Sequence, residues 1–441
     1  MIAILDREKM QAQQLEEVQS ALFAARAAQH HWAQRATTER ARLIGDLRPF
    51  IAGEATRLAE ITAAVGERPA AEKLVSEVLP LVEACRFLQK NAARILRSQR
   101  FGRSGRPLWL HGSSFEVHRK PFGVVLIVGP SNYPLFIPAV QMLHALVAGN
   151  AVLIKPAPDS TAPISHFVER VLSRSEIPRD LVQVLPETTD AARDVVQLGI
   201  DKAVFTGSSE NGRDFLGYLA ENNTPSVMEL SGADAVFVRA DADVQLAAKA
   251  IAFGRRLNGG NTCMAPHAIV VHISAAMALA QALTACGLRQ MKFVAVRDDQ
   301  EAIEIARIDQ HGLGAAIFSK DEAAARRFAA QLRTGFATIN DIVLPTADPR
   351  FPFGGVRGSG FGTTRGAEGL LEMTYPHAVA VRRARFLPHR EQPQAGEEQL
   401  FAAFIRLAHG RGVSSRLAAM RALVGAARNR MQKTRQSTLK A

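Results

Sequence analysis

One cysteine stands in a loop rich in glycine and amide side chains, in residues 258–266, which read NGGNTCMAP. Gly259 and Gly260 permit backbone conformations that residues with a Cβ resist, so neighbouring N–H groups can turn toward whatever the sulfur attacks. This pattern favours Cys263 as a nucleophile. The alternative is that Cys263 is a small buried hydrophobic residue, as free cysteines commonly are.

Two other strand ends carry groups suited to a phosphate. The loop from Thr206 to Gly212 follows an apolar run and opens a helix, whose free N–H groups and dipole favour an anion. Its two glycines, Gly207 and Gly212, are also common in ordinary strand-to-helix turns. Lys155 ends another strand on the same edge of the sheet, either as a phosphate ligand or as an ordinary surface cation. Together these groups indicate a phosphate or pyrophosphate site.

The elements that position these groups alternate between apolar runs and helical patterns from Phe122 to Leu230. Strands are expected at residues 123–128, 151–154, 181–185 and 203–205, with helices near 138–147, from about 162, from about 190, and at 211–221. Continuous apolar strands separated by amphipathic helices predict an α/β fold with a parallel sheet covered on both faces. In a doubly wound layout of this kind, ligands bind beyond the carboxyl ends of the strands.

Length and composition indicate a globular enzyme-sized chain. Its 441 residues exceed what one hydrophobic core usually serves, so two or three lobes are expected. The three cysteines are too few and too scattered for a disulfide framework, and no CxxC pair indicates zinc. Residues 1–20 lack a secretion signal and the most apolar stretch is interrupted by polar residues, so we expect a soluble cytoplasmic body.

The positive charge is concentrated at the C-terminus. Residues 401–441 contain nine Lys or Arg and no acidic residue, so they carry +9 of the net charge of +12. No nucleic-acid motif accompanies them, and we expect no specific nucleic-acid partner. Apolar residues from Leu417 to Met431 recur at helical spacing, opposed by Arg421 and Arg428. Such a basic amphipathic helix binds an anionic membrane surface or an acidic partner, or is a solvated terminal helix.

Six motifs, in order along the chain, resemble those of the aldehyde dehydrogenase superfamily. They are Pro121-Phe122-Gly123 with Asn132, Ala148-Gly149-Asn150 through Lys155-Pro156, Phe205-Thr206-Gly207-Ser208 through Gly212, Glu229-Leu230-Ser231-Gly232, Gly260-Asn261-Thr262-Cys263, and Asn340 with Pro352-Phe353-Gly354-Gly355 through Gly360. The resemblance covers roughly residues 36–383. It implies a Rossmann-like cofactor domain, an α/β catalytic domain and a β-hairpin oligomerisation arm.

The resemblance also implies roles for individual residues. Cys263 would be the nucleophile, Asn132 an oxyanion donor together with the Cys263 backbone N–H, and Glu229 the general base for the water that releases the acid. Cofactor contacts would come from Lys155, Gly207, Ser208 and Gly212, with NAD or NADP as the cofactor and no metal. Without the resemblance, Asn132 reads as a turn residue and Glu229 as a solvated or structurally paired carboxylate.

The sequence departs from the family's pattern at residues that are expected to bind the cofactor. The family's Glu-x-Phe-Gly-Pro-like motif, whose glutamate holds the nicotinamide ribose, is absent, and residues 286–290 at its expected place offer no carboxylate. Pro158 interrupts the acidic position after Lys155-Pro156, although Asp159 is adjacent, so the choice between NAD and NADP stays open. We expect a shortened catalytic domain. Cys286 is expected to pack at a helix end, with a disulfide to Cys263 as the alternative.

These observations define four regions. We expect a helical entry and cofactor domain at 1–106 and 121–230, an oligomerisation arm at 107–120 and 372–385, a shortened catalytic domain at 231–371, and a linker with a basic tail at 386–441. The predicted function is NAD(P)-dependent oxidation of an aldehyde through a Cys263 thioester, in a homo-oligomer (dimer or tetramer) that is cytoplasmic or peripherally membrane-associated. The alternatives are an acyl-CoA or acyl-phosphate reductase and a catalytically silent scaffold.

Overall fold

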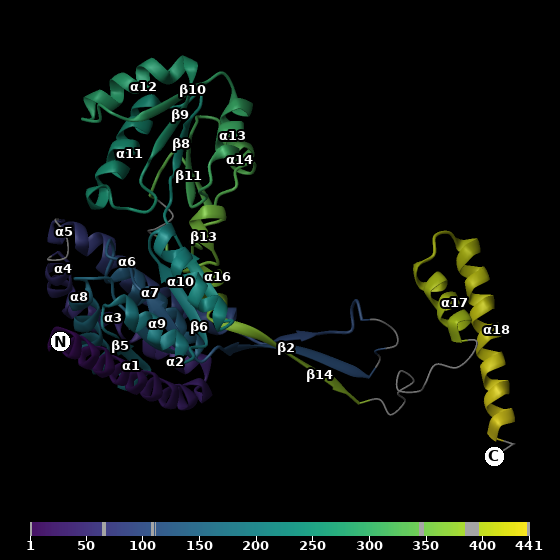
Figure 1. The fold of residues 1–441 in the computed structure, drawn as a ribbon. Coiled ribbons are helices and arrows are strands. Elements are labelled where there is room, and N and C mark those ends of the chain that lie inside the picture. Colours follow the sequence, from purple (N-terminus) through teal and green to yellow (C-terminus); the bar gives the residue numbers. More distant parts are fainter. Residues whose placement is uncertain are drawn as a thin grey trace. The chain divides into compact units, whose positions relative to one another are not determined.

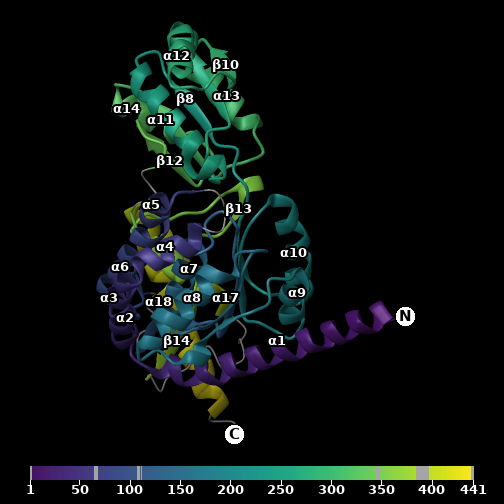
Figure 2. The same cartoon turned by 90° about the vertical axis from the view of Figure 1, so that its left-hand side faces the viewer.

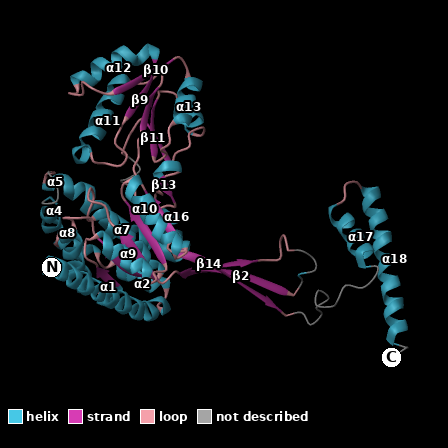
Figure 3. Cartoon of the chain, in the orientation of Figure 1, coloured by secondary structure: helices cyan, strands magenta, loops and turns pink. Residues whose placement is uncertain are grey.

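The structure is a computed structural model that describes residues 2–63, 68–106, 110, 112–343, 348–383 and 397–438. The chain divides into two compact units, Met1–Arg100 with Glu116–Val379 and Phe101–Phe115 with Ala380–Ala441. The first unit contains one entirely parallel sheet and one sheet that is parallel except for a single edge strand; strands are magenta in Figure 3.

The first hundred residues are helical, as predicted. The helices are α1 (Ile2–Gln34), α2 (Thr37–Gly45), α3 (Arg48–Gly53), α4 (Ala55–Ala63), α5 (Ala70–Lys73), which continues into a π-helical segment (Leu74–Val78), and α6 (Leu79–Ile95). Figure 2 shows α1 as one long helix. Trp32 Nε1 donates to the carbonyl of Leu146 at 2.7 Å, and Arg40 Nε donates to that of Val147 at 2.9 Å. Leu146 and Val147 lie in the last turn of the helix Phe136–Ala148, so these bonds fix the entry helices to that helix. The Arg40 cation also offsets the dipole at its carboxyl end.

The first sheet has the strand order β13-β7-β6-β3-β4-β5, with β13 antiparallel and the other strands parallel. Its strands are β3 (Val124–Val128), β4 (Ala151–Lys155), β5 (Val182–Val184), β6 (Lys202–Thr206), β7 (Ser226–Glu229) and β13 (Gly360–Phe361). The chain starts at β3, adds β4 and β5 on one side, and then crosses to β6 and β7 on the other. The predicted doubly wound fold class is confirmed, and the strand order reverses between β3 and β6, where such sheets bind ligands.

The helices of this sheet begin and end close to the predicted positions. They are α7 (Phe136–Ala148), α8 (Thr161–His166) with a π-helical segment (Phe167–Val171) and a 3₁₀ turn (Leu172–Arg174), a 3₁₀ turn at Arg179–Leu181, α9 (Thr189–Gln197) and α10 (Ser209–Glu221). α7 ends at Gly149, whose φ of 105° is a left-handed cap. The apolar side chains of β3, β4 and β6 are buried among these helices, as continuous hydrophobic runs require.

The second sheet has the order β10-β9-β8-β11-β12, with all strands parallel. Its strands are β8 (Ala235–Val238), β9 (Ala268–His272), β10 (Lys292–Val296), β11 (Gly314–Phe318) and β12 (Phe336–Ile339). Its helices are α11 (Val244–Arg256), a 3₁₀ turn (Leu257–Gly260), α12 (Ile273–Ala285), α13 (Asp299–Ile308) and α14 (Glu322–Ala329). Val236 packs with α11 and α12, whereas the next residue, Phe237, packs with α13 and α14, so the helices cover opposite faces (Figure 1).

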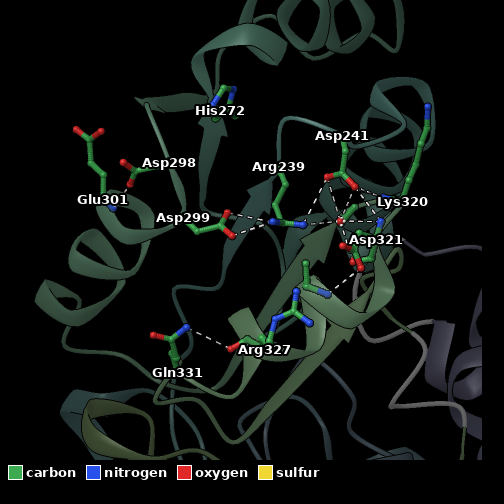
Figure 4. Close-up of polar contacts among 12 residues, drawn as sticks. Arg239, Asp241, His272, Asp298, Asp299, Glu301, Lys320, Asp321, Arg327 and Gln331 are labelled. Carbon is green, nitrogen blue, oxygen red and sulfur yellow. Dashed lines mark hydrogen bonds and ion pairs between the residues drawn. The ribbon is translucent and has the colours of Figure 1, made fainter.

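A polar cluster closes the carboxyl ends of β8 and β11 (Figure 4). Arg239 forms a bidentate pair with Asp299, with N–O distances of 3.0 and 2.9 Å. Asp241 accepts from the hydroxyl of Ser319 and from the backbone N–H of Asp321 at 2.8 Å. These bonds join the two strand ends to the starts of α13 and α14, so the cluster is structural and lies at the sheet edge opposite the amino ends of the strands.

A further sheet contains β1 (Gln99–Phe101), β2 (Ser113–Pro121) and β14 (Thr374–Arg382), in the order β1-β2-β14. In the first segment of the predicted arm, residues 107–120, the structure describes β2 from Ser113 onward, and most of residues 107–111 lie outside the described part of the chain. The helix α16 (Gly366–Glu372) precedes β14, and a 3₁₀ turn (Arg357–Ser359) precedes β13.

The C-terminal tail contains two helices, α17 (Glu397–His409) and α18 (Val413–Thr438), where the sequence indicated one. The segment expected as a linker lies mostly outside the described residues. Among the described helices, none combines the length and the apolar character that crossing a membrane requires.

Candidate active site

The carboxyl ends of the first sheet and the amino side of the second sheet surround one cavity of about 1230 Å³. Its wall includes six of the seven residues predicted for the site: Asn132, Lys155, Gly207, Ser208, Glu229 and Cys263. Gly212 is not in the wall. A Cβ at Gly212 would come within 2.3 Å of the Leu230 side chain, so this glycine allows α10 to pack closely against the sheet.

The loop that carries Cys263 has an unusual backbone conformation and is held in place by hydrogen bonds. Asn258, Gly259 and Gly260 have φ values of 53°, 59° and 84°, so the left-handed conformation predicted for the glycines extends to Asn258. The Asn258 amide donates to the carbonyl of Asn132 at 2.9 Å, and the hydroxyls of Thr262 and Tyr133 are 2.9 Å apart. These bonds fix the loop against the segment that follows β3.

Asn132 lies beside the cysteine loop, where an oxyanion donor is needed. Its Nδ2 donates to the carbonyl of Asn261 at 2.8 Å. An amide nitrogen has two hydrogens, so this bond orients the group and leaves one hydrogen for a ligand. Its Oδ1 is buried and accepts no hydrogen bond from the described residues. The geometry therefore suits a donor directed by the loop that carries Cys263.

A buried ion pair that the sequence did not single out supports Asn132 from the entry helices. Arg68 Nη2 contacts Glu77 Oε1 at 2.7 Å and donates to the carbonyl of Asn132 at 3.0 Å, while its guanidinium lies 4.8 Å from the centre of the Tyr133 ring. Glu77 Oε2 accepts from the backbone N–H of Leu135 at 3.0 Å. Burial raises the pKa of Glu77, and Leu135 and Arg68 oppose this shift. No motif in the first hundred residues signalled this contact.

Glu229 ends β7 and is buried, with 6% of its surface exposed. Its carboxylate accepts hydrogen bonds from the hydroxyls of Thr364 and of Thr206, the latter at 3.2 Å. Burial raises the pKa of Glu229, and the bond from Thr364 and the charge of Arg365 oppose this shift. A carboxylate with a raised pKa that shares a cavity with a cysteine is suited to accept a proton.

The surroundings of Cys263 oppose ionisation of its thiol. Burial raises its pKa to about 12, the negative charges of Glu229 and Asp234 raise it further, and Arg365 opposes them. A thiolate is the reactive form of cysteine. Ionisation of the Cys263 thiol is therefore costly in free energy, and a cation or a proton acceptor must lower that cost.

Two of these charged groups escaped the sequence analysis. Asp234 is buried, its Oδ1 accepts from the Gly314 N–H at 3.1 Å, and burial raises its pKa to about 7. Arg365 is also buried, and its guanidinium lies 4.5 Å from the centre of the Phe353 ring. The only sequence signal was their position: Asp234 comes two residues after the Ser231-Gly232 step, and Arg365 follows the last glycine-rich motif.

Three other residues of the cavity wall, Lys155, Gly207 and Ser208, fit a phosphate. Lys155 Nζ forms no hydrogen bond with a described side chain or carbonyl, and burial lowers its pKa, with Glu187 opposing. Ser208 is the N-cap of α10 and accepts from the Asn211 N–H at 3.2 Å. A Cβ at Gly207 would come within 2.9 Å of the Phe205 ring, so only glycine keeps the wall this close. A buried cation that lines the same cavity as a helix N-terminus makes a suitable anion site.

The carboxylate expected to hold a nicotinamide ribose has no clear replacement. Within the described part of the chain, the acidic side chains in the wall are Glu229 and Asp214, and Asp214 is paired with Arg193 at 3.0 Å. Asp159 is exposed, with a φ of 58°, and does not line the cavity. Cys286 is a free cysteine that caps the end of α12, as expected. The phosphate end of a dinucleotide therefore fits better than its nicotinamide end.

The known proteins that are similar to this chain belong to one enzyme family. The model of the aldehyde dehydrogenase family matches residues 7–293 and 291–379, and the two matches meet just after residues 286–290, the expected place of the Glu-x-Phe-Gly-Pro-like motif. The chain is 28% identical over 438 residues to 4,4'-diapolycopene aldehyde oxidase of Methylomonas sp, covering 83% of this chain and 82% of the relative. It is 25% identical over 350 residues to 4,4'-diaponeurosporen-aldehyde dehydrogenase of Staphylococcus aureus, covering 63% and 76%.

A solved structure has the same fold. The crystal structure of an NAD-dependent aldehyde dehydrogenase from Sinorhizobium meliloti superposes with a TM-score of 0.78 at 21% identity, covering 86% of this chain and 89% of the other.

Proposed function

The chain belongs to the aldehyde dehydrogenase family, and we propose that it oxidises an aldehyde to a carboxylic acid through a thioester on Cys263, with NAD or NADP as hydride acceptor. One observation carries the proposal: Cys263, Asn132 and Glu229 line the same cavity as Lys155 and the N-terminus of α10. A nucleophile, an oxyanion donor, a base and an anion site are thus available to one bound substrate and one dinucleotide.

The first role belongs to the cysteine loop. The Cys263 thiol loses its proton, and the sulfur adds to the aldehyde carbon, so that the carbonyl oxygen becomes an oxyanion. The free N–H of the Asn132 amide and the backbone N–H of Cys263 stabilise that charge. Because the pKa of the thiol is about 12, proton loss is the step that the site must assist. The proton passes to solvent, so Glu229 remains available as the base for the later hydrolysis.

When bound, the cofactor would supply a hydride acceptor, and loss of a hydride from the substrate carbon would leave a thioester on Cys263. Lys155 and the N–H groups at the start of α10 would hold the pyrophosphate. Glu229 then accepts a proton from the water that attacks the thioester. That attack releases the carboxylic acid and returns the thiol. Overall, aldehyde, water and the oxidised cofactor give the acid, the reduced cofactor and a proton.

The direct test is an absorbance assay for NADH or NADPH formation. Purified protein is mixed with each cofactor and with a panel that includes 4,4'-diapolycopene aldehyde and short aliphatic aldehydes. Cys263→Ala should abolish turnover, whereas Cys286→Ser, a cysteine outside the cavity wall, should retain it. Oxygen consumption is recorded in parallel. Aldehyde oxidation that consumes oxygen without reducing either cofactor contradicts the proposed hydride acceptor.

Two alternatives follow from specific observations. An acyl-CoA or acyl-phosphate reductase would use Cys263 but would not need Glu229, so Glu229→Gln would leave its rate unchanged. A catalytically silent scaffold is favoured by the missing ribose carboxylate. It predicts no cofactor binding by calorimetry in a folded protein. Retention of Cys263, Asn132 and Glu229 around one cavity supports the oxidative reaction over both.

We also propose a cytoplasmic homo-oligomer, a dimer or a tetramer. The support is the sheet of β1, β2 and β14, in which β14 is an edge strand with the exposed apolar residues Tyr375 and Val381, 40% and 42% exposed. Exposed strand edges are sites of pairing between chains. Light scattering of the full chain tests this proposal, and a monomeric mass at micromolar concentration contradicts it.

A further inference from the structure

The C-terminal helices α17 and α18 form a hairpin joined by residues 410–412, with the helices drawn side by side in Figure 1. The seam between them is lined by Ala403 and Ala419, which are 2% and 4% exposed. Phe404 and Leu423 are half-buried beside them. The two helices thus use one apolar row each to bind one another.

Each helix carries a second apolar row that nothing in the described structure covers. On α17 this row contains Phe401 and Ile405, which are 55% and 58% exposed. On α18 it contains Leu417, Met420 and Val424, which are 50%, 49% and 46% exposed. Spacings of three and four residues place each row along one face of its helix.

The two exposed rows lie on the same side of the hairpin. Ile405 comes one position after the seam residue Phe404, and Met420 and Val424 each come one position after the seam residues Ala419 and Leu423. One residue rotates a side chain by about 100° around an α-helix, so both rows are displaced from the seam in the same sense. Because the helices of a hairpin run antiparallel, equal displacements bring the rows to a common surface. We call the surface formed by Phe401, Ile405, Leu417, Met420 and Val424 the apolar face.

Positive charge borders this face. Arg421 follows Met420, and Arg428 lies one turn beyond Val424; both are exposed. Acidic residues in the hairpin are confined to Glu397 and Glu398 in the first turn of α17, and residues 401–441 carry nine cations and no acid.

The charge around the apolar face indicates which kind of partner would cover it: a second copy, a nucleic acid or a membrane. A second copy of the hairpin would bring two strongly positive segments together, and like charges at an interface are costly. A nucleic acid would neutralise the arginines but would leave the apolar row in water. An anionic bilayer satisfies both features, because apolar side chains enter the acyl boundary while arginines contact lipid phosphates.

We propose that the apolar face docks on an anionic lipid membrane, with α17 and α18 lying in the plane of the interface. The hairpin rests on the surface, since no described helix is able to span the bilayer. Docking does not involve Cys263 or the cavity, so it goes beyond the proposed reaction and is tested separately from it.

The test is co-sedimentation of the full chain with vesicles of phosphatidylglycerol and phosphatidylcholine, compared with phosphatidylcholine alone. The variant Leu417→Ser/Met420→Ser/Val424→Ser removes the apolar row of α18, and Arg421→Glu/Arg428→Glu removes its cationic border. A matched control, Met277→Ser/Ile308→Ser, changes two apolar residues of the first unit that are 76% and 78% exposed.

We expect the full chain and the control to bind anionic vesicles, and each hairpin variant to lose about tenfold or more in partitioning. Helix content, measured by circular dichroism, should be the same for all four proteins. Three results overturn the proposal: a full chain that stays in the supernatant, equal binding by the hairpin variants and the control, or a change of oligomeric mass in the apolar variant with unchanged vesicle binding. The last result would assign the face to contacts between copies. Stronger binding to a DNA duplex than to anionic vesicles at equal salt overturns it as well.

Discussion

The reactivity of the Cys263 thiol toward an alkylating agent is the most revealing property of the free protein. Burial and two nearby carboxylates raise its pKa to about 12, whereas an exposed cysteine has a pKa of about 8.5. At pH 8 the thiolate fraction is then about one in ten thousand, against roughly a quarter for an exposed thiol. Iodoacetamide should therefore modify Cys263 roughly a thousandfold more slowly than a free cysteine at that pH.

The pH dependence of the alkylation rate tests both the direction and the size of the pKa shift of Cys263. Because the pKa lies above the accessible range, the rate should rise about tenfold for each pH unit from 7 to 10 without levelling off. Glu229→Gln keeps an acceptor for the Thr364 and Thr206 hydroxyls but removes one negative charge near the sulfur. The rate at pH 8 should then increase, by about tenfold if the thiol pKa falls by one unit.

The assay is peptide mapping by mass spectrometry after timed alkylation, which separates Cys263 from the other two cysteines. Cys85 is fully buried in α6, and burial raises its pKa to about 12, so it provides a slow internal reference. A plateau of the Cys263 rate near pH 8 or 9 would refute the electrostatic reasoning. Slower alkylation in Glu229→Gln would refute the charge effect of that carboxylate on the thiol pKa.

Three further predictions concern buried ionisable side chains other than the Cys263 thiol. Burial raises the pKa of Asp234 to about 7, so the folded state loses stability as the pH rises from about 4 to 7. Asp234→Asn should therefore increase the free energy of unfolding at pH 8 by up to about 4 kcal/mol and should have little effect at pH 4, as measured by urea unfolding. Burial lowers the pKa of His144 to about 4, so the unfolded chain gains its proton first and stability falls by about 3 kcal/mol as the pH drops from 6.5 to 4; His144→Leu should reduce this acid sensitivity, and an unchanged slope contradicts the assignment. Arg68→Met leaves Glu77 buried without its closest cation and should cost about 3–5 kcal/mol in unfolding free energy, while Arg68→Met/Glu77→Gln should recover part of it; no recovery would mean that the pair does not act as a unit.

The strands of the first sheet were the most predictable part of the fold. The runs Val124–Val128 and Ala151–Lys155 are apolar at every position except the last lysine, and they form buried parallel strands with helices on both faces. Continuous apolar runs of this kind are typical of parallel strands that helices cover on both faces. The tail was less predictable, because Ala403 and Ala419 contribute too little hydrophobic signal to reveal that two helices pack together.

The candidate site divides in the same way. Cys263 and Glu229 could be proposed from the sequence because their neighbours form recognisable local motifs. Arg68 was missed because its contact with Asn132 joins residues 64 positions apart, and no local spacing reveals such a contact. Asp234 and Arg365 were missed for a related reason: their importance comes from burial beside the sulfur, which depends on how separate segments pack.

The central claim is that Cys263 becomes acylated during aldehyde oxidation, and one measurement addresses it directly. Glu229→Gln is mixed with aldehyde and NAD or NADP, quenched in acid, and analysed by intact-protein and peptide mass spectrometry. We expect an added acyl mass on Cys263, formed with one equivalent of reduced cofactor, because the variant lacks the base that promotes hydrolysis. Reduced cofactor without any adduct on Cys263, or an adduct that appears equally in Cys263→Ala, would contradict the mechanism.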